Sequence, residues 1–359
     1  MKAVVRRGRS LVEADIPEVQ AGQGQVLVKT LACGICGSDL HALHHLEHTV
    51  DMGKRAGAPD TIDITKDLVM GHEFCGEILD HGPGTTGQLK AGTRVVSTPF
   101  AIGPEGPELV GFSTRYPGGF GERMVLTEAL LLEVPNGLSA DQAAMTEPMA
   151  VGLHAVDSAD LSGRPVALVI GCGPVGLAVI AALKRRGVGP IIAADYAEGR
   201  RALAERMGAD IVVNPASSSP HGHWQQFEVA ATLAEMGREA FTGKVFRPAI
   251  IFECVGVPGL LQSIIEQGPP LAQVIVVGAC AEDDRILPAL AITKQLSFRF
   301  VFAYSAPEFE QTLDDIAQGR IDVTPLLSGT VGRSGVAQAF VDLANPGSLA
   351  KIMIRPAEA

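Results

Sequence analysis

The chain has 359 residues, of which 47% are hydrophobic and 19% are charged, the composition of a globular enzyme with more than one domain. Its formal net charge of -11 repels phosphate backbones and anionic lipid surfaces, so we expect neither nucleic acid nor a membrane as a partner. The N-terminal segment contains no apolar run long enough for a signal peptide, which predicts a cytoplasmic location. Six irregularly spaced cysteines favour free thiols or metal ligands over a disulfide framework.

Residues 1 to about 132 predict a β-rich section, because short runs rich in Val, Leu and Ile alternate with Gly and Pro. Within this section, the polar composition of Ala42–Lys66 predicts a loop with at most a short helix. Two interpretations of this loop stay open. It is a solvated surface insertion, which costs little stability, or it covers the substrate cleft and selects among substrates.

After about Glu147, strand-like runs alternate with Ala-, Leu- and Arg-rich helical stretches, which predicts a six-stranded doubly wound parallel sheet. The stretch Asn214–Gly243 is longer than a usual connection, and we interpret it as a surface insertion. The C-terminal part predicts two helices, PEFEQTLDDIAQG and SGVAQAFVDLAN, followed by a last strand, AKIMIRP.

The sequence VIGCGPVG predicts a dinucleotide-binding turn, since its glycines follow an apolar run and precede a helical stretch. Gly171 permits the tight turn, Gly173 lets the backbone approach a pyrophosphate, and Gly176 lets helix and strand pack closely. Such glycines also occur at turns that bind nothing. The residues assigned to the cofactor in or near this turn and at the ends of later strands are Gly171, Gly173, Pro174, Val175, Gly176, Val255 and Val277.

Asp195 strengthens this interpretation, because it ends the next apolar run at about the spacing where an acid meets the ribose hydroxyls of the adenosine. An acid there favours NAD and repels the additional phosphate of NADP. Arg200, which we also assign to the cofactor site, and Arg201 weaken the preference, because an arginine nearby can hold that phosphate. We expect NAD.

The segment CGICGSDLH at residues 33–41 gathers two cysteines, a serine, an aspartate and a histidine. A zinc ribbon would need a second CxxC, which the chain lacks, and the fold context of a thioredoxin-like motif is missing. Together with GHEFCGEI at 71–78 and the glycine-rich turn with its acid, in this order, the segment resembles the zinc-containing medium-chain alcohol dehydrogenases. GGFGERM at 118–124 and EPMAVGLHA at 147–155 support the resemblance, which covers nearly the whole chain.

The resemblance implies an α/β fold of two domains. A GroES-like, β-rich, zinc-binding catalytic domain would comprise residues 1–150 and 305–359. A Rossmann domain with a doubly wound parallel sheet would comprise residues 151–304. The strand-like LSFRFVFAY at 296–304 lies where family members pair their subunits, so we expect a homodimer or homotetramer.

By the same resemblance, Cys36 and His72 are ligands of a catalytic zinc, and Glu147 stands where family members supply Cys, Asp or Glu. Three protein ligands leave the fourth position open for water or alcohol. Glu73 resembles a mobile carboxylate that coordinates the metal in part of the cycle or only tunes its field. The alternative for Glu147 is an ordinary acid at a helix N-terminus.

Three further residues complete the implied catalytic set. Asp39 resembles the acid that orients a ligand histidine, although an aspartate at this position also caps turns, and the two roles are compatible. Ser38 and His41 resemble a relay that carries the proton of the alcohol to solvent. The stretch between Ser97 and Phe120 contains no cysteine, so we expect one catalytic zinc per chain and no structural zinc.

The function implied is a zinc-dependent, NAD-dependent oxidoreductase that interconverts a primary, secondary or polyol alcohol and its aldehyde or ketone by hydride transfer. One alternative is a zinc-free reductase of quinones or alkenes from the same superfamily, which would not need Cys36 and His72 together with the relay. Another is a non-catalytic NAD-binding protein, against which the complete relay argues.

Overall fold

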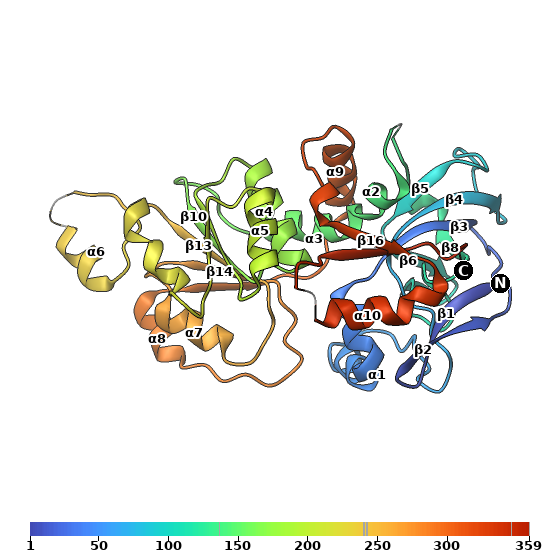
Figure 1. Cartoon of the computed structure of the whole chain (residues 1–359), viewed down its shortest axis with the longest axis horizontal. Helices are drawn as coiled ribbons and strands as arrows, with labels where there is room; N and C mark the ends of the chain where they lie inside the picture. Colours follow the sequence, from blue (N-terminus) through green and yellow to red (C-terminus); the bar gives the residue numbers. More distant parts are fainter. Residues whose placement is uncertain (136, 240, 242, 346, 359) are drawn as a thin grey trace. The chain divides into compact units, whose positions relative to one another are not determined.

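The computed structural model describes residues 1–135, 137–239, 241, 243–345 and 347–358. The chain forms two compact units, labelled by their elements in Figure 1. The first unit consists of Met1–Glu147, Phe309–Gly319 and Leu326–Ala359, and the second of Pro148–Glu308 and Arg320–Pro325. The chain passes between the units four times: within helices α3 (Thr146–Asp157) and α9 (Ala306–Ala317), between Gly319 and Arg320, and within a 3₁₀ turn, Thr324–Leu326.

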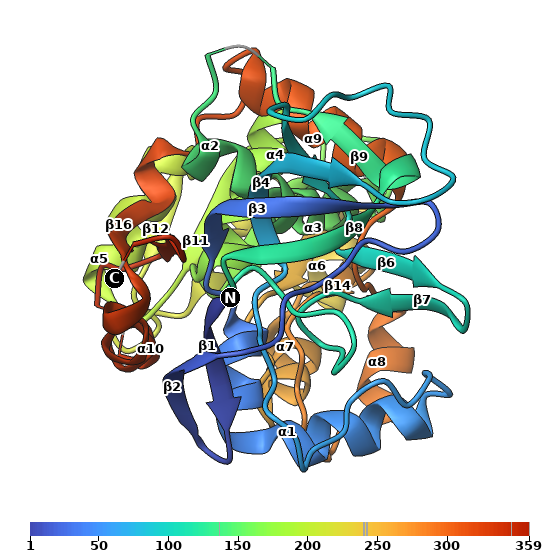
Figure 2. The ribbon, with the colours of Figure 1, turned by 90° about the vertical axis from the view of Figure 1, so that its right-hand side faces the viewer.

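The first unit is built on a seven-stranded, mostly antiparallel sheet in the order β16-β17-β3-β4-β5-β9, with β8 also paired to β3. Figure 2 shows β3, β4 and β8 lying side by side. Two small antiparallel sheets, β1-β2 and β6-β7, complete the strands of this unit within the described residues. The strands are β1 (Lys2–Arg7), β2 (Ser10–Asp15), β3 (Gln25–Gly34), β4 (Glu73–His81), β5 (Arg94–Ser97), β6 (Phe100–Gly103), β7 (Gly106–Leu109), β8 (Arg123–Thr127), β9 (Leu131–Glu133), β16 (Leu327–Val331) and β17 (Lys351–Ile354). The predicted β-rich first section is therefore confirmed.

Helix α1 (Gly37–Arg55) contradicts part of the prediction for Ala42–Lys66, because it is a 19-residue helix that continues well into that segment. Ala42, Leu43 and Leu46 recur at helical spacing and are buried in the core of the first unit. The histidines and charged residues between them lie on the other face and hid this pattern. The chain is irregular only from Ala56 to Lys66. The unit also contains α2 (Ala140–Ala144), α10 (Val336–Ala344) and the 3₁₀ turns Glu128–Leu130 and Arg333–Gly335.

The second unit is a six-stranded, fully parallel sheet in the order β12-β11-β10-β13-β14-β15, which confirms the predicted doubly wound arrangement. Helices α4 and α5 lie on one face of the sheet and α7 and α8 on the other (Figure 1). The strands are β10 (Val166–Ile170), β11 (Ile191–Ala194), β12 (Ile211–Val213), β13 (Ala249–Glu253), β14 (Gln273–Val276) and β15 (Ser297–Phe300). The helices are α4 (Pro174–Arg185), α5 (Glu198–Met207), α6 (Leu233–Glu239), α7 (Leu260–Gln267) and α8 (Pro288–Lys294).

The stretch Asn214–Gly243 is only partly a surface insertion. Two 3₁₀ turns, Pro220–His223 and Gln225–Phe227, enclose Trp224, which is 1% exposed and packs in the core of the second unit. The prediction is wrong for this central part because burial of one large aromatic ring anchors the turns. Helix α6 follows on the surface, whereas Ala240 and Thr242 lie outside the described residues.

A helix that crosses a bilayer must be long and predominantly apolar. None of the helices in the described part of the chain combines the necessary length with sufficient apolar character.

Candidate active site

Three potential metal ligands of the first unit come together. Cys36, His72 and Glu73 each offer one donor atom, and these atoms lie within 4.8 Å of one another. His72 and Glu73 are buried, and Cys36 is half-buried. Within the described residues, this is the only such group of three or more His, Cys, Asp or Glu side chains. The sequence predicted all three members.

Strand register explains how residues from distant parts of the chain meet at this point. Gly34, at the end of β3, lies opposite Glu73 on β4 and opposite Met353 on β17. Two residues beyond Gly34, Cys36 begins helix α1 as its N-cap. A side chain at position 34 would overlap the Glu73 carboxylate, so glycine is needed there.

Asp39 joins the helix terminus to the histidine. Its Oδ2 accepts a hydrogen bond of 2.9 Å from the Cys36 backbone N–H, and its Oδ1 lies 3.7 Å from His72 Nδ1. Among the described residues, this oxygen and this nitrogen are both buried without a hydrogen-bond partner. A metal ion on the other ring nitrogen, Nε2, would fix a proton on Nδ1 and direct it toward Asp39.

The electrostatics of His72 also fit a metal. Burial by itself lowers the pKa of His72, but the adjacent Asp39 carboxylate and Cys36 sulfur outweigh burial and raise that pKa well above its ordinary value. The site therefore attracts positive charge to the imidazole. A divalent cation bound by sulfur, nitrogen and carboxylate oxygen would neutralise the same negative charges. This set of donor atoms suits zinc.

Lys351 is a residue of the candidate site that the sequence analysis did not identify. It is 1% exposed, and its Nζ donates hydrogen bonds of 2.7 Å to both oxygens of Glu73 and one of 3.0 Å to the Ile35 carbonyl. Burial lowers the pKa of Lys351, but the nearby anions Glu73, Cys36 and Glu147 outweigh burial and raise it, so the amine stays charged. The signal was a lysine inside the apolar run of AKIMIRP, where an unpaired charge would be costly.

Glu147 lies in the first turn of α3, half-buried and close enough to Lys351 to stabilise its charge. Among the described residues, it is not part of the group whose donor atoms lie within 4.8 Å of one another. Its role as a ligand therefore stays a prediction. Lys351 and a divalent ion would together balance the charges of Glu73, Glu147 and a Cys36 thiolate.

Ser38 and His41 follow Cys36 in the first turns of α1, and both are exposed. The two side chains share one side of the helix because residues three apart are neighbours there. Partial burial, and then the proximity of His45 and His48, lower the pKa of His41. A neutral imidazole at this position is able to accept a proton.

The glycine-rich turn lies in the second unit, between β10 and α4. Gly171 has φ of +92°, and a side chain at Gly176 would overlap the Gly171 carbonyl oxygen, so both positions require glycine. A Cβ at Gly173 would meet nothing within 4 Å, which leaves an open approach to the N-terminus of α4. Pro174 is the first residue of this helix, and Val175 follows it. The turn fits the diphosphate of a dinucleotide.

Asp195 follows β11, and its side chain is hydrogen-bonded to the glycine-rich turn. Its Oδ2 accepts a hydrogen bond of 2.9 Å from the Cys172 N–H, and its Oδ1 accepts one of 2.8 Å from the Ala197 N–H. Each carboxylate oxygen has a second lone pair that a ribose hydroxyl can use. Arg200 Nη1 lies 3.9 Å from Asp195 Oδ2, so the basic group and the acid are neighbours as the sequence suggested.

The two valines assigned to the cofactor lie beyond the ends of adjacent parallel strands. Val255 follows β13, is 45% exposed and approaches Gly171, whereas Val277 follows β14 and is half-buried. Glu253 was missed by the sequence reasoning. Its buried Oε1 accepts hydrogen bonds of 2.7 and 2.8 Å from the N–H groups of Val255 and Gly256, which fixes this loop.

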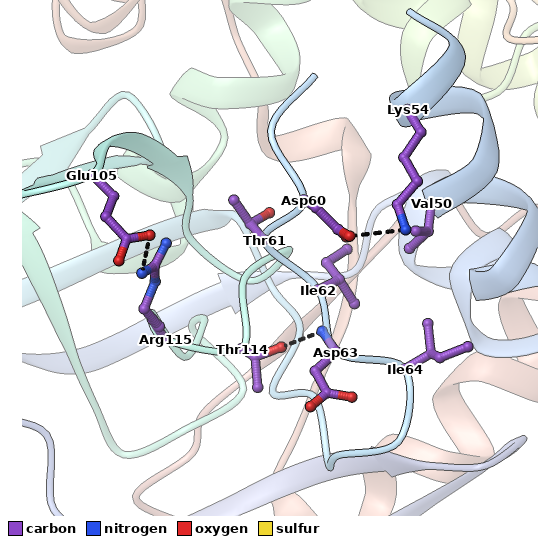
Figure 3. A pocket seen from close by; sticks show the side chains of 10 residues that line it. All are labelled: Val50, Lys54, Asp60, Thr61, Ile62, Asp63, Ile64, Glu105, Thr114 and Arg115. Carbon is purple, nitrogen blue, oxygen red and sulfur yellow. Dashed lines mark hydrogen bonds and ion pairs between the residues drawn. The ribbon is translucent and has the colours of Figure 1, made fainter. Parts of the chain in front are cut away.

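A surface pocket of about 420 Å³ lies in the first unit, and Cys36, His72 and Glu73 are not among the residues that line it. Figure 3 shows its lining side chains. Lys54 of α1 pairs with Asp60 at 2.8 Å, and Arg115 pairs with Glu105 at 2.5 Å, so the charges of its walls neutralise one another. The lining residues are Val50, Lys54, Asp60, Thr61, Ile62, Asp63, Ile64, Glu105, Thr114 and Arg115. The irregular half of Ala42–Lys66 therefore forms one wall of a polar hollow.

Comparisons with known proteins agree with this geometry. A family model described as alcohol dehydrogenase GroES-like domain matches residues 22–136, and one described as zinc-binding dehydrogenase matches residues 174–318. The chain is 33% identical over 350 residues to (R,R)-butanediol dehydrogenase of Bacillus subtilis, covering 95% of each chain. It is 27% identical over 358 residues to L-threonine 3-dehydrogenase of Streptomyces coelicolor, covering 96% of each.

Solved structures show the same relationship. The crystal structure of 2R,3R-butanediol dehydrogenase from Bacillus subtilis matches with a TM-score of 0.78 at 28% identity, over 99% of both chains. That of galactitol-1-phosphate dehydrogenase from Escherichia coli matches with a TM-score of 0.76 at 26% identity, over 99% of this chain and 100% of the other.

The fold, the donor set and the glycine-rich turn define an oxidoreductase that interconverts alcohols and carbonyl compounds. More narrowly, the chain belongs to the zinc-type medium-chain dehydrogenase family. The predictions of family, fold class and enzyme class are confirmed.

Proposed function

We propose that this protein is a zinc-dependent, NAD-linked dehydrogenase of a secondary alcohol that carries a polar group on the neighbouring carbon. The observation that carries the proposal is the group of Cys36, His72 and Glu73 donors within 4.8 Å of one another, beside the buried Lys351. In this proposal residues 1–150 and 305–359 hold the metal, and residues 151–304 hold the dinucleotide.

Cys36 and His72 would hold one zinc ion, with Glu147 as the third ligand. Glu73 would reach the metal only by exchanging its two hydrogen bonds to Lys351, so its first role is to set the local charge. When bound, zinc acts as a Lewis acid that lowers the pKa of the alcohol hydroxyl, and the nicotinamide accepts the hydride.

The residues of α1 would manage the proton. Ser38 Oγ accepts it from the substrate hydroxyl and passes its own proton to His41, whose neutral ring accepts it and delivers it to solvent. Asp39 would orient His72 through Nδ1, and Lys351 would hold the buried carboxylate of Glu73 in place through its two hydrogen bonds.

Asp195 supports NAD over NADP, because its carboxylate lies at the end of β11 and would repel a phosphate on the ribose. Arg200 is close to this carboxylate and is partly neutralised by it, which weakens the competing attraction for that phosphate.

The relatives support the substrate class. Their names give a diol with hydroxyls on neighbouring carbons, an amino acid and a sugar alcohol phosphate. A secondary hydroxyl beside a second polar group is the element that these substrates have in common.

We also propose that the protein acts in the cytoplasm as a homodimer or homotetramer. All six cysteines are free thiols, which fits a reducing compartment. Strand β15 is the last strand in the order of its sheet, and Phe300 and Phe302 near it are 69% and 92% exposed. An edge strand with exposed aromatic residues is suited to pair with a second copy.

The test is a panel of alcohols with NAD, read by the formation of NADH, on protein of measured zinc content. Vicinal diols and polyols should give higher kcat/KM than matched simple alcohols, and chelation of zinc should abolish the activity. Oxidation that persists after zinc removal would favour a zinc-free reductase. No oxidation of any alcohol by zinc-loaded protein would favour a non-catalytic NAD-binding protein.

A further inference from the structure

Helix α1 concentrates histidine to an unusual degree. Four of the nine histidines of the chain lie between positions 41 and 48, and all four, His41, His44, His45 and His48, are exposed. The proposed mechanism uses only His41. The other three carry imidazoles that neither the metal site nor the relay employs.

Helix α1 has a kink at His45, and the rings of His45 and His48 both contact the ring of His41. His45 has φ of -130° and ψ of 32°, outside the helical range, and interrupts the helix between His41 and His48. In a regular helix, residues seven apart are separated by about 10 Å along the axis. Here the ring centroids of His41 and His48 are only 6.5 Å apart, and those of His41 and His45 are 5.0 Å apart with planes 29° from parallel.

This spacing suits a shared ion. A ring nitrogen binds a divalent transition metal at about 2.0–2.1 Å, which places two coordinating ring centroids roughly 5–6 Å apart. Among the described residues these histidines do not form a group with donor atoms within 4.8 Å of one another, so a shared ion would require their side chains to rotate. All three rings are exposed, and exposed side chains change rotamer rapidly. His41 is the ring that both His45 and His48 contact, whereas the ring of His44 contacts that of His45, edge to face at 6.4 Å, and makes no ring contact with His41 among the described residues.

We propose that His41, His45 and His48 form a second metal site, on the surface of α1, for a divalent transition metal such as Ni²⁺, Cu²⁺ or Zn²⁺. Imidazole is the ligand that these ions share, whereas Mg²⁺ and Ca²⁺ prefer oxygen. The ligands of this site are distinct from the Cys36, His72 and Glu73 group.

Occupancy of the site has a consequence that rests on the proposed function. An imidazole that donates its lone pair to a metal ion cannot accept a proton. Binding at His41 therefore removes the last member of the relay, and the metal inhibits alcohol oxidation without displacing the catalytic zinc. The enzyme would be slowed by excess of the metal class that it requires.

Metal binding is tested by isothermal titration of the zinc-loaded protein with NiCl₂ in a buffer that does not chelate. The wild type should bind one Ni²⁺ per chain beyond its zinc, and zinc analysis after the titration should show no loss. His45→Ala should weaken binding by at least about tenfold, because it removes one of the three ligands and leaves the relay residue His41 in place. His44→Ala is the matched control on the same helix and should bind as the wild type does.

Inhibition is measured on the same proteins as alcohol oxidation with and without Ni²⁺. The wild type and His44→Ala should lose most of their activity at saturating Ni²⁺, whereas His45→Ala should keep it. Equal Ni²⁺ binding by all three proteins, or no binding, would overturn the metal site. Binding without inhibition would overturn its coupling to the relay. If no alcohol is oxidised by any of them, the proposed function fails, whereas the titration still decides the metal site.

Discussion

The proposed dinucleotide-binding turn lies within one β-α-β segment, from Gly171 to Asp195. The proposed metal site instead draws Cys36 from just beyond β3, and Glu73 and Lys351 from the starts of β4 and β17. The first site is made mainly of backbone in a fixed conformation. The second is made of buried charges that stabilise one another. The turn should therefore be disrupted by substitutions that add a side chain where there is no room. The metal site should be disrupted by substitutions that remove one of its charges.

The largest effect is expected for Lys351→Met, which leaves the buried carboxylate of Glu73 without its partner. Breaking a buried ion pair from one side typically costs about 3–5 kcal/mol. Urea unfolding should show a loss of this size, and zinc content should fall. The double variant Glu73→Gln with Lys351→Met should recover most of the stability, since it removes both charges. Wild-type stability of Lys351→Met alone would contradict the account.

Gly176→Ala should damage the second site without affecting the first. Its Cβ would overlap the Gly171 carbonyl oxygen, so α4 must shift away from β10, at a cost of about 1–3 kcal/mol. NADH binding, followed by fluorescence, should be largely lost while zinc content stays at the wild-type level. Gly173→Ala is the control, because its Cβ meets no atom within 4 Å, and it should lower NADH affinity without lowering stability. A zinc loss in Gly176→Ala would show that the sites are not independent.

This contrast also explains what the sequence could predict. The glycine-rich turn and Asp195 could be predicted because they lie close together in the sequence, where the glycines act through the backbone and Asp195 through its carboxylate. Cys36, His72 and Glu73 were found through two separated motifs, and the register of β3 and β4 brings them together. Lys351 was missed because its role arises only when β17 pairs with β3, and no local pattern contains that pairing.

The sequence analysis misjudged two segments in which a few buried apolar residues stand among many polar ones. The histidines of α1 suggested a polar loop, although Ala42, Leu43 and Leu46 on the opposite face are buried. Trp224 was assigned to a surface insertion because serine, proline and histidine precede it, yet its ring packs in the core. In both segments, a few apolar residues outweigh a polar majority, since burial depends on the face and not on average composition.

Asp195→Asn should have a moderate effect on cofactor choice. Removing the charge weakens the hydrogen bonds to the ribose and the repulsion of a phosphate, so the ratio of kcat/KM for NAD over NADP should fall about tenfold. The comparison of both cofactors with one alcohol measures it. If the wild type already uses NADP as efficiently as NAD, the role assigned to Asp195 is wrong.

The effect that is smallest near neutral pH concerns His221, where burial lowers the pKa to about 4. The unfolded chain takes up this proton near pH 6.5, so the folded state loses stability as the pH falls from about 6.5 to 4, by about 1–3 kcal/mol. His221→Gln should flatten this part of the stability profile in urea unfolding at successive pH values. His223→Gln, in the same turn, should leave the profile unchanged. A steep loss in His221→Gln would assign the pH dependence to other groups.

The central claim is that Cys36 holds a catalytic zinc, and elemental analysis of Cys36→Ser beside the wild type tests it most directly. The account predicts about one zinc per chain in the wild type, and a folded but nearly metal-free variant, because a three-ligand site depends on each ligand. Circular dichroism establishes that the variant is folded. Stoichiometric zinc in folded Cys36→Ser would contradict the assignment of the site.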